Sequence, residues 1–320
     1  MQKRTLGDSL TVSALGLGCM GMSQGYGPAD DDASLATLHR ALDLGVTLLD
    51  TAQSYGAGHN ERLLSRLLAT RRDEVTLATK FGIVRDADGT RLDAHPDRVA
   101  GYCDASLRRL GVDTIDLYYL HRPDPAVPVA DTIGAMAALV RAGKVRHLGI
   151  SEPSPADLAS AAAVHPIAAV QSEWSLWWRE VEDEVVPTAR RLGIGVVPYS
   201  PLGSGILAGA TSAAPFRDRD PRYAGADRDR NLALLGEVQA IAAEHGVSSG
   251  QLALAWLLAQ GDDVVPIPGT RNADRLAENA AAADLVLTAA ELDRLETAVP
   301  RGAWAGDRNS FAAHGATRTG

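Results

Sequence analysis

The chain alternates two kinds of apolar pattern from Leu15 onward. Short, almost uninterrupted apolar runs are typical of strands buried on both faces of a parallel sheet. They predict strands at 15–18, 46–50, 75–80, 115–120, 147–150, 168–171, 195–199 and 264–267. Between these runs, apolar residues recur with helical spacing. This second pattern predicts helices at 32–44, 60–68, 97–110, 129–142, 155–164, 180–192, 230–246, 249–260, 272–283 and 289–298.

Eight successive strand–helix units without a compositional break predict an α/β fold, a closed (β/α)8 or TIM barrel in one domain over residues 1–320. Runs 4–6 and 10–12, either side of a Gly-Asp-Ser turn, predict a short hairpin before the barrel. The connection 209–229, rich in Pro, Arg and Asp, is predicted to be a long structureless loop over the strand-7 rim. We expect residues 300–320, which contain one Trp, Trp304, to form a loosely ordered tail that reaches the pocket mouth.

Charge and cysteine content narrow the functional classes. The net charge is −9 and the isoelectric point about 5.4, which argues against nucleic-acid binding and against binding to anionic membranes. Cys19 and Cys103 are the only cysteines, so we expect no disulfide framework and a reducing, cytoplasmic setting. The longest apolar helix candidate, 252–259, is too short to cross a bilayer. These features favour a protein whose partners are small molecules, and leave its oligomeric state open.

The first strand is followed by a glycine pattern that suggests a different fold. Gly16, Gly18 and Gly21 have the spacing G-x-G-x-x-G, and the next strand ends in an acid, Asp50, as in a Rossmann dinucleotide fold. That motif requires a helix to begin at its third glycine, but Gly21 is followed by Met-Ser-Gln-Gly-Tyr-Gly-Pro. We therefore favour the barrel, with these glycines lining a strand-1 rim that a cofactor or substrate approaches closely.

Three neighbouring strands of the predicted barrel each end in a different ionisable residue. Asp50 and Lys80 are the last residues of the second and third strands, His121 follows the fourth, and Tyr55 lies in the loop after Asp50. Carboxyl ends of barrel strands meet at one rim, so we expect these side chains to converge. A phenol with its usual pKa near 10 is a poor proton donor at neutral pH, and a neighbouring ammonium lowers that pKa. The pattern predicts a proton-donating Tyr tuned by Lys.

The same residues lie in sequence motifs that resemble the aldo-keto reductase superfamily. The segment Gly45-Val-Thr-Leu-Leu-Asp-Thr-Ala-Gln-Ser-Tyr-Gly, the Asn-Glu pair that follows, Ala-Thr-Lys80 and Asp-Leu-Tyr-Tyr-Leu-His121 carry the likeness. The resemblance extends from the first strand to Asn279, with Ser65 a small departure. It implies a general acid at Tyr55, a Lys80 that lowers its pKa, an Asp50 that pairs with the Lys, and a His121 that orients the carbonyl.

The resemblance also implies NADPH as cofactor, in preference to NADH, and no metal. Nicotinamide contacts are expected from Ser151, Glu152, Gln171 and Tyr199, with Glu152 standing where relatives usually have Asn. The expected pyrophosphate loop comprises Ser200, Pro201, Leu202, Gly203 and Gly205. The expected adenine and 2′-phosphate residues are Ile267, Gly269, Thr270, Arg271, Arg275, Glu278 and Asn279. Gly18, Cys19 and Met20 are expected at the strand-1 rim.

The predicted substrate is an aldehyde or ketone that is reduced to an alcohol. Trp174, Trp177 and Trp178 follow strand 6 and suggest an apolar pocket wall, although packing of Trp178 against the next helix is the stronger expectation for that residue. The alternative is an NADP(H)-binding sensor of the potassium-channel β-subunit type, which would keep the same residues. A barrel glycosidase needs paired carboxylates, whereas strands 4 and 7 end in His121 and Tyr199.

Overall fold

The computed structural model describes residues 1–86, 89–210, 214–215 and 217–308, and confirms the predicted barrel. Seven parallel strands are hydrogen-bonded in the order β3-β4-β5-β8-β9-β10-β11. They are β3 (Leu17–Gly18), β4 (Leu48–Asp50), β5 (Thr76–Phe81), β8 (Ile115–Leu120), β9 (Val145–Ser151), β10 (Ile167–Glu173) and β11 (Gly195–Tyr199). Every residue of β8 and β10 is buried, as expected for strands covered on both faces.

The predicted eighth strand closes the barrel through bridges at its two ends. Val264 pairs with Val196 of β11, and Gly269 pairs with Gly18 of β3. Pro266 and Pro268 lack the N–H that a continuous ladder needs, so each contributes only its carbonyl to the amides of strand 1.

The glycines of strand 1 are explained by this closure. A Cβ on Gly18 would lie 2.9 Å from the Ile267 carbonyl oxygen, and one on Gly16 would lie 2.8 Å from the Ile267 side chain. The groups that closely approach Gly16 and Gly18 are therefore the chain's own, and the approach of a cofactor or substrate to this rim stays a prediction. Strand 1 leads to the short helix η1 (Met20–Met22), which excludes the Rossmann arrangement.

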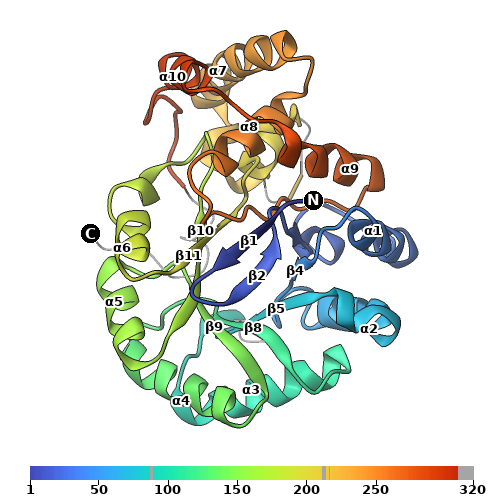
Figure 1. The fold of residues 1–320 in the computed structure, drawn as a ribbon, viewed down its shortest axis with the longest axis vertical. Helices are drawn as coiled ribbons and strands as arrows, with labels where there is room; N and C mark the ends of the chain where they lie inside the picture. Colours follow the sequence, from blue (N-terminus) through green and yellow to red (C-terminus); the bar gives the residue numbers. More distant parts are fainter. Residues whose placement is uncertain (87–88, 211–213, 216, 309–320) are drawn as a thin grey trace.

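Helices form a ring around the strands (Figure 1). They are α1 (Asp31–Asp43), α2 (His59–Arg71), α3 (Pro96–Leu110), α4 (Val129–Arg141), α5 (Pro155–Val164), α6 (Val185–Arg191), α7 (Gly225–Glu244), α8 (Ser249–Leu258), α9 (Ala273–Ala281) and α10 (Ala289–Ala298). The helix predicted at 180–192 is divided into η3 (Glu180–Glu182) and α6. Pro187 explains the division, because a proline is tolerated in the first turn of a helix but not in its interior.

Two hairpins flank the barrel. The predicted one, β1 (Lys3–Leu6) with β2 (Leu10–Ser13), lies across the amino-terminal end of the strands (Figure 1). Gly195 of β11 leaves room for it, because a Cβ there would lie 2.4 Å from the Leu6 side chain. A second hairpin, β6 (Ile83–Asp86) with β7 (Gly89–Leu92), follows β5 and was not predicted, since its short strands lack a hydrophobic pattern.

Two predictions of irregular structure are wrong for the described residues. Within the connection 209–229 lie η5 (Arg217–Arg219), η6 (Pro221–Tyr223) and the start of α7, which begins five residues earlier than expected; η4 (Gly203–Ala208) directly precedes this connection. The segment after α10 is ordered by packing: Trp304 is buried, and its ring centroid lies 5.7 Å from that of Trp177. Residues 309–320 of the expected tail lie outside the described residues.

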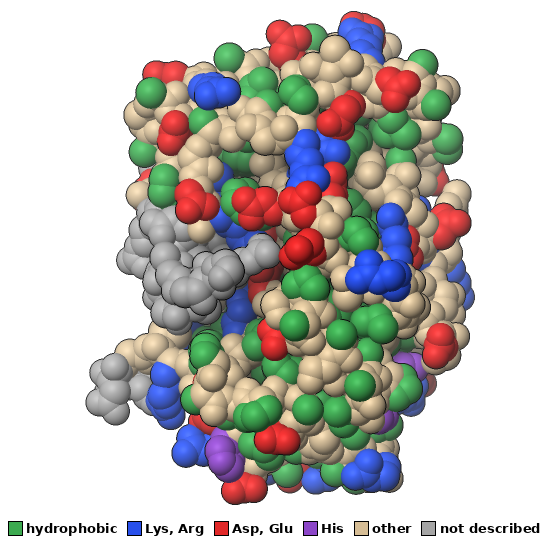
Figure 2. Space-filling model, turned by 90° about the vertical axis from the view of Figure 1, so that its left-hand side faces the viewer, with side chains coloured by type: hydrophobic (Ala, Val, Ile, Leu, Met, Phe, Trp, Pro, Cys, Tyr) green, Lys and Arg blue, Asp and Glu red, His purple; other side chains and the backbone are tan. Residues whose placement is uncertain are grey.

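Charges of both signs are mixed on the face of the molecule that Figure 2 shows. Acidic and basic side chains are interspersed on the face shown in Figure 2, with no extended field of one sign. No helix among the described residues combines the length and the apolar character needed to traverse a bilayer.

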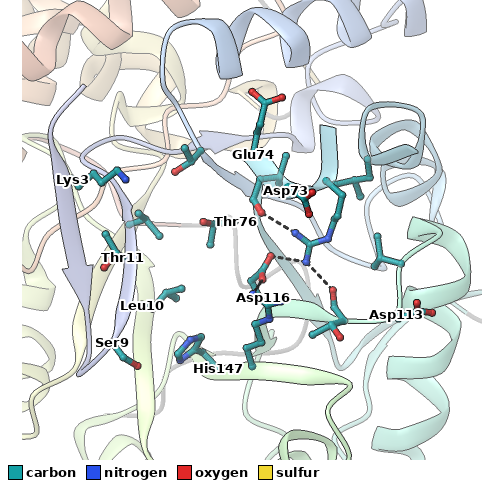
Figure 3. A pocket seen from close by; sticks show the side chains of 18 of the residues that line it. Lys3, Ser9, Leu10, Thr11, Asp73, Glu74, Thr76, Asp113, Asp116 and His147 are labelled. Carbon is teal, nitrogen blue, oxygen red and sulfur yellow. Dashed lines mark hydrogen bonds and ion pairs between the residues drawn. The ribbon is translucent and has the colours of Figure 1, made fainter. Parts of the chain in front are cut away.

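A cavity of about 750 Å³ lies at the amino-terminal ends of β4, β5, β8 and β9, beside the β1–β2 hairpin (Figure 3). Its centre is marked by Asp116, a buried carboxylate that pairs with Arg72 at 2.8 Å and Arg146 at 3.3 Å and accepts the backbone N–H of Leu77. This end of the barrel is opposite the rim that carries Asp50, Lys80 and His121. The contacts of Asp116 tie adjacent strand beginnings together, which indicates a role in stability.

Candidate functional site

The structure brings Asp50, Tyr55, Lys80 and His121 together at the carboxyl ends of the strands. The Lys80 ammonium is fully buried and contacts the Asp50 carboxylate. It also donates to the Thr51 carbonyl at 2.9 Å and lies 3.3 Å from the Tyr55 hydroxyl. The Tyr55 and His121 rings meet edge to face, with centroids 5.9 Å apart. One ammonium therefore connects a carboxylate to a phenol whose ring faces an imidazole.

The Tyr55 loop is fixed from below by the first turn of α2. Asn60 accepts the Thr51 hydroxyl at 2.6 Å and donates to the Cys19 carbonyl at 2.9 Å. Glu61, fully buried, accepts the Thr79 hydroxyl at 2.7 Å and pairs with Arg109 of α3. These bonds join α2 to the ends of β3 and β4 and to β5. Tyr55 is therefore held on a rigid support although its own loop is glycine-rich.

Burial and charge act in opposite directions on the phenol. Burial raises the pKa of Tyr55, Lys80 lowers it, and the net pKa lies above the usual value of 10. For Lys80, burial lowers the pKa, but Asp50 and Tyr55 outweigh it, so the net pKa is raised. Lys80 is therefore an ammonium and Tyr55 a neutral phenol at neutral pH. Lys80 does lower the Tyr55 pKa, as predicted, but this effect offsets only part of the increase that burial causes.

The expected nicotinamide residues lie on the three strands after β8. Ser151 and Gln171 are register partners on β9 and β10, and Tyr199 ends β11. Gln171 donates to the second oxygen of Asp50 at 2.8 Å, which links this group to the Tyr55–Lys80 pair. Glu152 follows Ser151 with a positive φ of 55°, rare for a residue with a side chain.

Two arginines that no sequence motif singles out lie among these residues. Arg122, directly after His121, is buried and donates to the Ser151 hydroxyl at 2.8 Å. Arg308, from the segment after α10, donates to Glu152 at 2.7 Å and to the Tyr199 hydroxyl at 3.2 Å. The position of Arg122 beside a strand-end His was a signal available in the sequence. No local pattern marks Arg308.

The expected pyrophosphate loop has a backbone suited to an anion. Ser200, Gly203, Ser204 and Gly205 all have positive φ, and successive residues of this kind orient amide groups toward a common point. Arg217 adds charge nearby, since its Nε donates to the Ser204 carbonyl at 2.9 Å. Pro201 and Leu202 lie between the first two of these left-handed positions.

The residues expected at the adenine end have divergent environments. Arg271 already donates to the carbonyls of Tyr26 and Gly27, at 3.0 and 3.2 Å. Arg275, in the first turn of α9, is exposed, and within the described part of the chain no hydrogen bond or ion pair engages its side chain. The remaining residues have three kinds of environment. Glu278 contacts Ser248, Asn279 and Ile267 are buried, and Gly269 and Thr270 follow the closing strand at the surface.

The three tryptophans after strand 6 do not form one pocket wall. Trp174 is in the core, where it packs edge to face on Trp256 of α8 and donates to Glu182 at 2.8 Å. Its expected place in a pocket wall is therefore wrong. Trp177 is also buried, and it fills the space over Gly203, where a Cβ would lie 2.3 Å from its ring. Trp178 is partly exposed, beside the guanidinium groups of Arg222 and Arg308.

Comparison with known proteins identifies the family of the chain. The sequence profile described as "Aldo/keto reductase family" matches residues 14–300. A "Probable aldo-keto reductase 1" from Glycine max is 42% identical over 305 residues, covering 93% of this chain and 88% of that protein.

Among solved structures, a glycerol dehydrogenase from Gluconobacter oxydans has a TM-score of 0.85 at 30% identity. An aldo/keto reductase from Klebsiella pneumoniae, in complex with NADP and acetate, has a TM-score of 0.73 at 28% identity. Each covers 93% of this chain and 96% of the other. The chain therefore belongs to the aldo/keto reductase family.

Proposed function

We propose that this protein reduces aldehydes or ketones to alcohols with NADPH, and that Tyr55 is the proton donor. The observation that carries the proposal is the contact of one buried ammonium, Lys80, with both Asp50 and the Tyr55 hydroxyl. Burial of an ion-paired lysine costs free energy, and buried charges of this kind are found most often at functional sites. Here its charge is directed at a phenol on the rim where barrel enzymes have their sites.

Each residue of the constellation has a distinct task. A carbonyl oxygen that enters between Tyr55 and His121 would meet two hydrogen-bond donors, the phenol O–H and an imidazole N–H. As negative charge develops on that oxygen, the phenol transfers its proton and the imidazole stabilises the charge. Asp50 keeps Lys80 in place, and Lys80 stabilises the phenolate that remains. When bound, NADPH supplies the hydride.

The residues present fit such a cofactor. Ser151 and Gln171 offer neighbouring polar groups at the end of the Asp50–Lys80–Tyr55 chain, and Tyr199 offers an aromatic face. The left-handed turns from Ser200 to Gly205 suit a pyrophosphate. The solved relative from Klebsiella pneumoniae, which binds NADP, supports the same choice.

The preference for NADPH rests on Arg275. It is exposed at the start of α9 and free of ion pairs with described residues, so its guanidinium is available for a 2′-phosphate. Arg271, the other arginine expected there, is already bonded to two backbone carbonyls. We therefore assign the contact with the 2′-phosphate to Arg275. Arg271 instead holds the loop that contains Tyr26 and Gly27.

A single-turnover experiment tests the proposal. The protein is mixed with NADPH and then, in a stopped-flow instrument, with a panel of aromatic and medium-chain aldehydes and ketones. We expect loss of the reduced-nicotinamide absorbance with at least one carbonyl, and an equal amount of the corresponding alcohol by mass spectrometry. If NADPH binds but no carbonyl of the panel oxidises it, the proposed reduction is contradicted and an NADP(H)-sensing protein is favoured.

A further inference from the structure

The segment after α10 brings an arginine whose side chain is only 6% exposed to the proposed cofactor end of the site. Arg308 donates to Glu152 at 2.7 Å and forms a second ion pair with Glu173 at 3.1 Å. Its guanidinium also donates to the Tyr199 hydroxyl at 3.2 Å. These partners lie at or just after the ends of β9, β10 and β11. A single side chain from outside the barrel therefore connects three adjacent strand ends.

The course of this segment is fixed by contacts of the residues just before Arg308. Asn231 of α7 makes two hydrogen bonds to the backbone of Ala305, at 2.8 and 3.0 Å. Gly306 passes so close to Arg222 that a Cβ would lie 2.9 Å from the Arg222 Cα. Together with the buried Trp304, these contacts bring residue 308 to the rim as a defined part of the structure.

The carboxylates beside Arg308 are compensated by the positive charges of arginine side chains. Glu173 is buried and pairs with Arg222 at 3.0 Å as well as with Arg308, and Arg222 in turn pairs with the buried Asp220. Burial raises the pKa of Glu152, but Arg308 and Arg122 outweigh it, so the carboxyl is ionised. Without Arg308, the carboxylates of Glu152 and Glu173 would both lose a positively charged partner. Loss of the partner of a buried charge is strongly destabilising.

Glu152 is also held by its backbone conformation and by hydrogen bonds to β10. It has a left-handed backbone, its Oε1 accepts the Glu173 N–H at 2.9 Å, and its own N–H donates to the Gln171 carbonyl. A shift of its side chain would therefore act on the ends of both β9 and β10. Arg308 also donates to the Tyr199 hydroxyl, and this hydrogen bond holds the Tyr199 ring.

We propose that Arg308 is a positioning residue of the site: inserted by the C-terminal segment, it fixes Glu152 and Tyr199 in the arrangement that receives the cofactor ring. NADPH affinity is then set in part by a residue far from the barrel motifs in the sequence. The inference rests on the proposed NADPH binding, because it assigns a role at the same site.

The test compares three variants of the full chain with wild type. Arg308→Met removes the charge and keeps most of the volume, and Arg308→Lys keeps the charge but loses the forked geometry. Arg301→Met is the matched control, because Arg301 lies in the same segment and pairs with Asp183 at the exposed surface. NADPH dissociation constants are measured by quenching of Trp fluorescence, well below each variant's melting temperature, which is recorded by circular dichroism.

We expect Arg308→Met to weaken NADPH binding by about tenfold or more, Arg308→Lys to weaken it less, and Arg301→Met to leave it unchanged. Unchanged or tighter binding by folded Arg308→Met would overturn the inference. If Arg308→Met does not fold, Arg308→Lys decides: wild-type affinity contradicts a positioning role, and weaker binding at an unchanged melting temperature supports it. Failure of wild type to bind NADPH would instead contradict the proposed function.

Discussion

The Lys80 ammonium lies 3.3 Å from the Tyr55 hydroxyl while it contacts the Asp50 carboxylate, and no part of it is exposed to solvent. This relationship joins two strands and a loop through one charge. Electrostatic interactions are stronger in such a place than in water. Small changes to Lys80 should therefore have large effects on proton transfer.

Replacement of Lys80 by Met should lower the rate of carbonyl reduction by about 10²–10⁴-fold, because the phenolate formed on proton transfer loses its counter-charge. Single-turnover rates at saturating NADPH measure this effect. NADPH affinity should change far less than the rate. A variant that keeps more than about half of the wild-type rate would show that the ammonium is not needed.

The pH dependence of reduction follows from the raised pKa of Tyr55. Burial outweighs the effect of Lys80, so the phenol keeps its proton at and above the pH where a free tyrosine loses it. The rate of proton donation should therefore be flat from about pH 6 to about pH 9 and fall only above about pH 10. Single-turnover rates in overlapping buffers give the profile. A decline with an apparent pKa of about 7 to 8 would mean that Lys80 dominates over burial.

Substitution of Arg275 by Ala should weaken NADPH by about tenfold and change NADH by less than about twofold, since only NADPH carries the 2′-phosphate. Fluorescence titrations with both dinucleotides measure the two affinities. Arg141→Ala, at the exposed last turn of α4, is the control and should change neither. Equal losses for both cofactors would place the phosphate elsewhere.

At the opposite end of the barrel, Asp116→Asn should destabilise the fold by about 1–3 kcal/mol, because a buried acceptor of two arginines and one amide loses its charge. Urea unfolding followed by circular dichroism measures the free energy. The exposed partner offers a control, as Arg146→Ala should cost at most about 1 kcal/mol. Both variants should keep the wild-type turnover rate, and a loss of turnover in folded Asp116→Asn would contradict a purely structural role.

The sequence predicts the barrel well because most of its strands are apolar runs whose residues are largely buried. The run at 115–120 coincides with β8, and the residue that follows it, His121, reaches the rim as expected. Convergence of Asp50, Lys80 and His121 follows from strand order alone, since parallel neighbours end at one edge. The least regular strand, 264–267, is interrupted by Pro266 and followed by Pro268, and no apolar pattern reveals these residues as breaks in hydrogen bonding.

What the sequence does not reveal are contacts between segments distant along the chain. Arg308 looks like an ordinary charge in a Gly- and Ala-rich tail, and only the packing of Trp304 and the Asn231–Ala305 hydrogen bonds brings it to Glu152. Trp174 fails as a predicted pocket residue for the same reason, because its neighbour Trp256 lies on α8. The net pKa of Tyr55 also depends on burial, which a sequence does not give.

The most direct test of the central claim is hydride transfer in Tyr55→Phe, which keeps the ring and removes the proton. We predict that this variant binds NADPH with near wild-type affinity, by quenching of Trp fluorescence, and that stopped-flow mixing with a carbonyl active in wild type gives a rate lower by about 10²-fold or more. Turnover near the wild-type rate would contradict the assignment of Tyr55 as the proton donor.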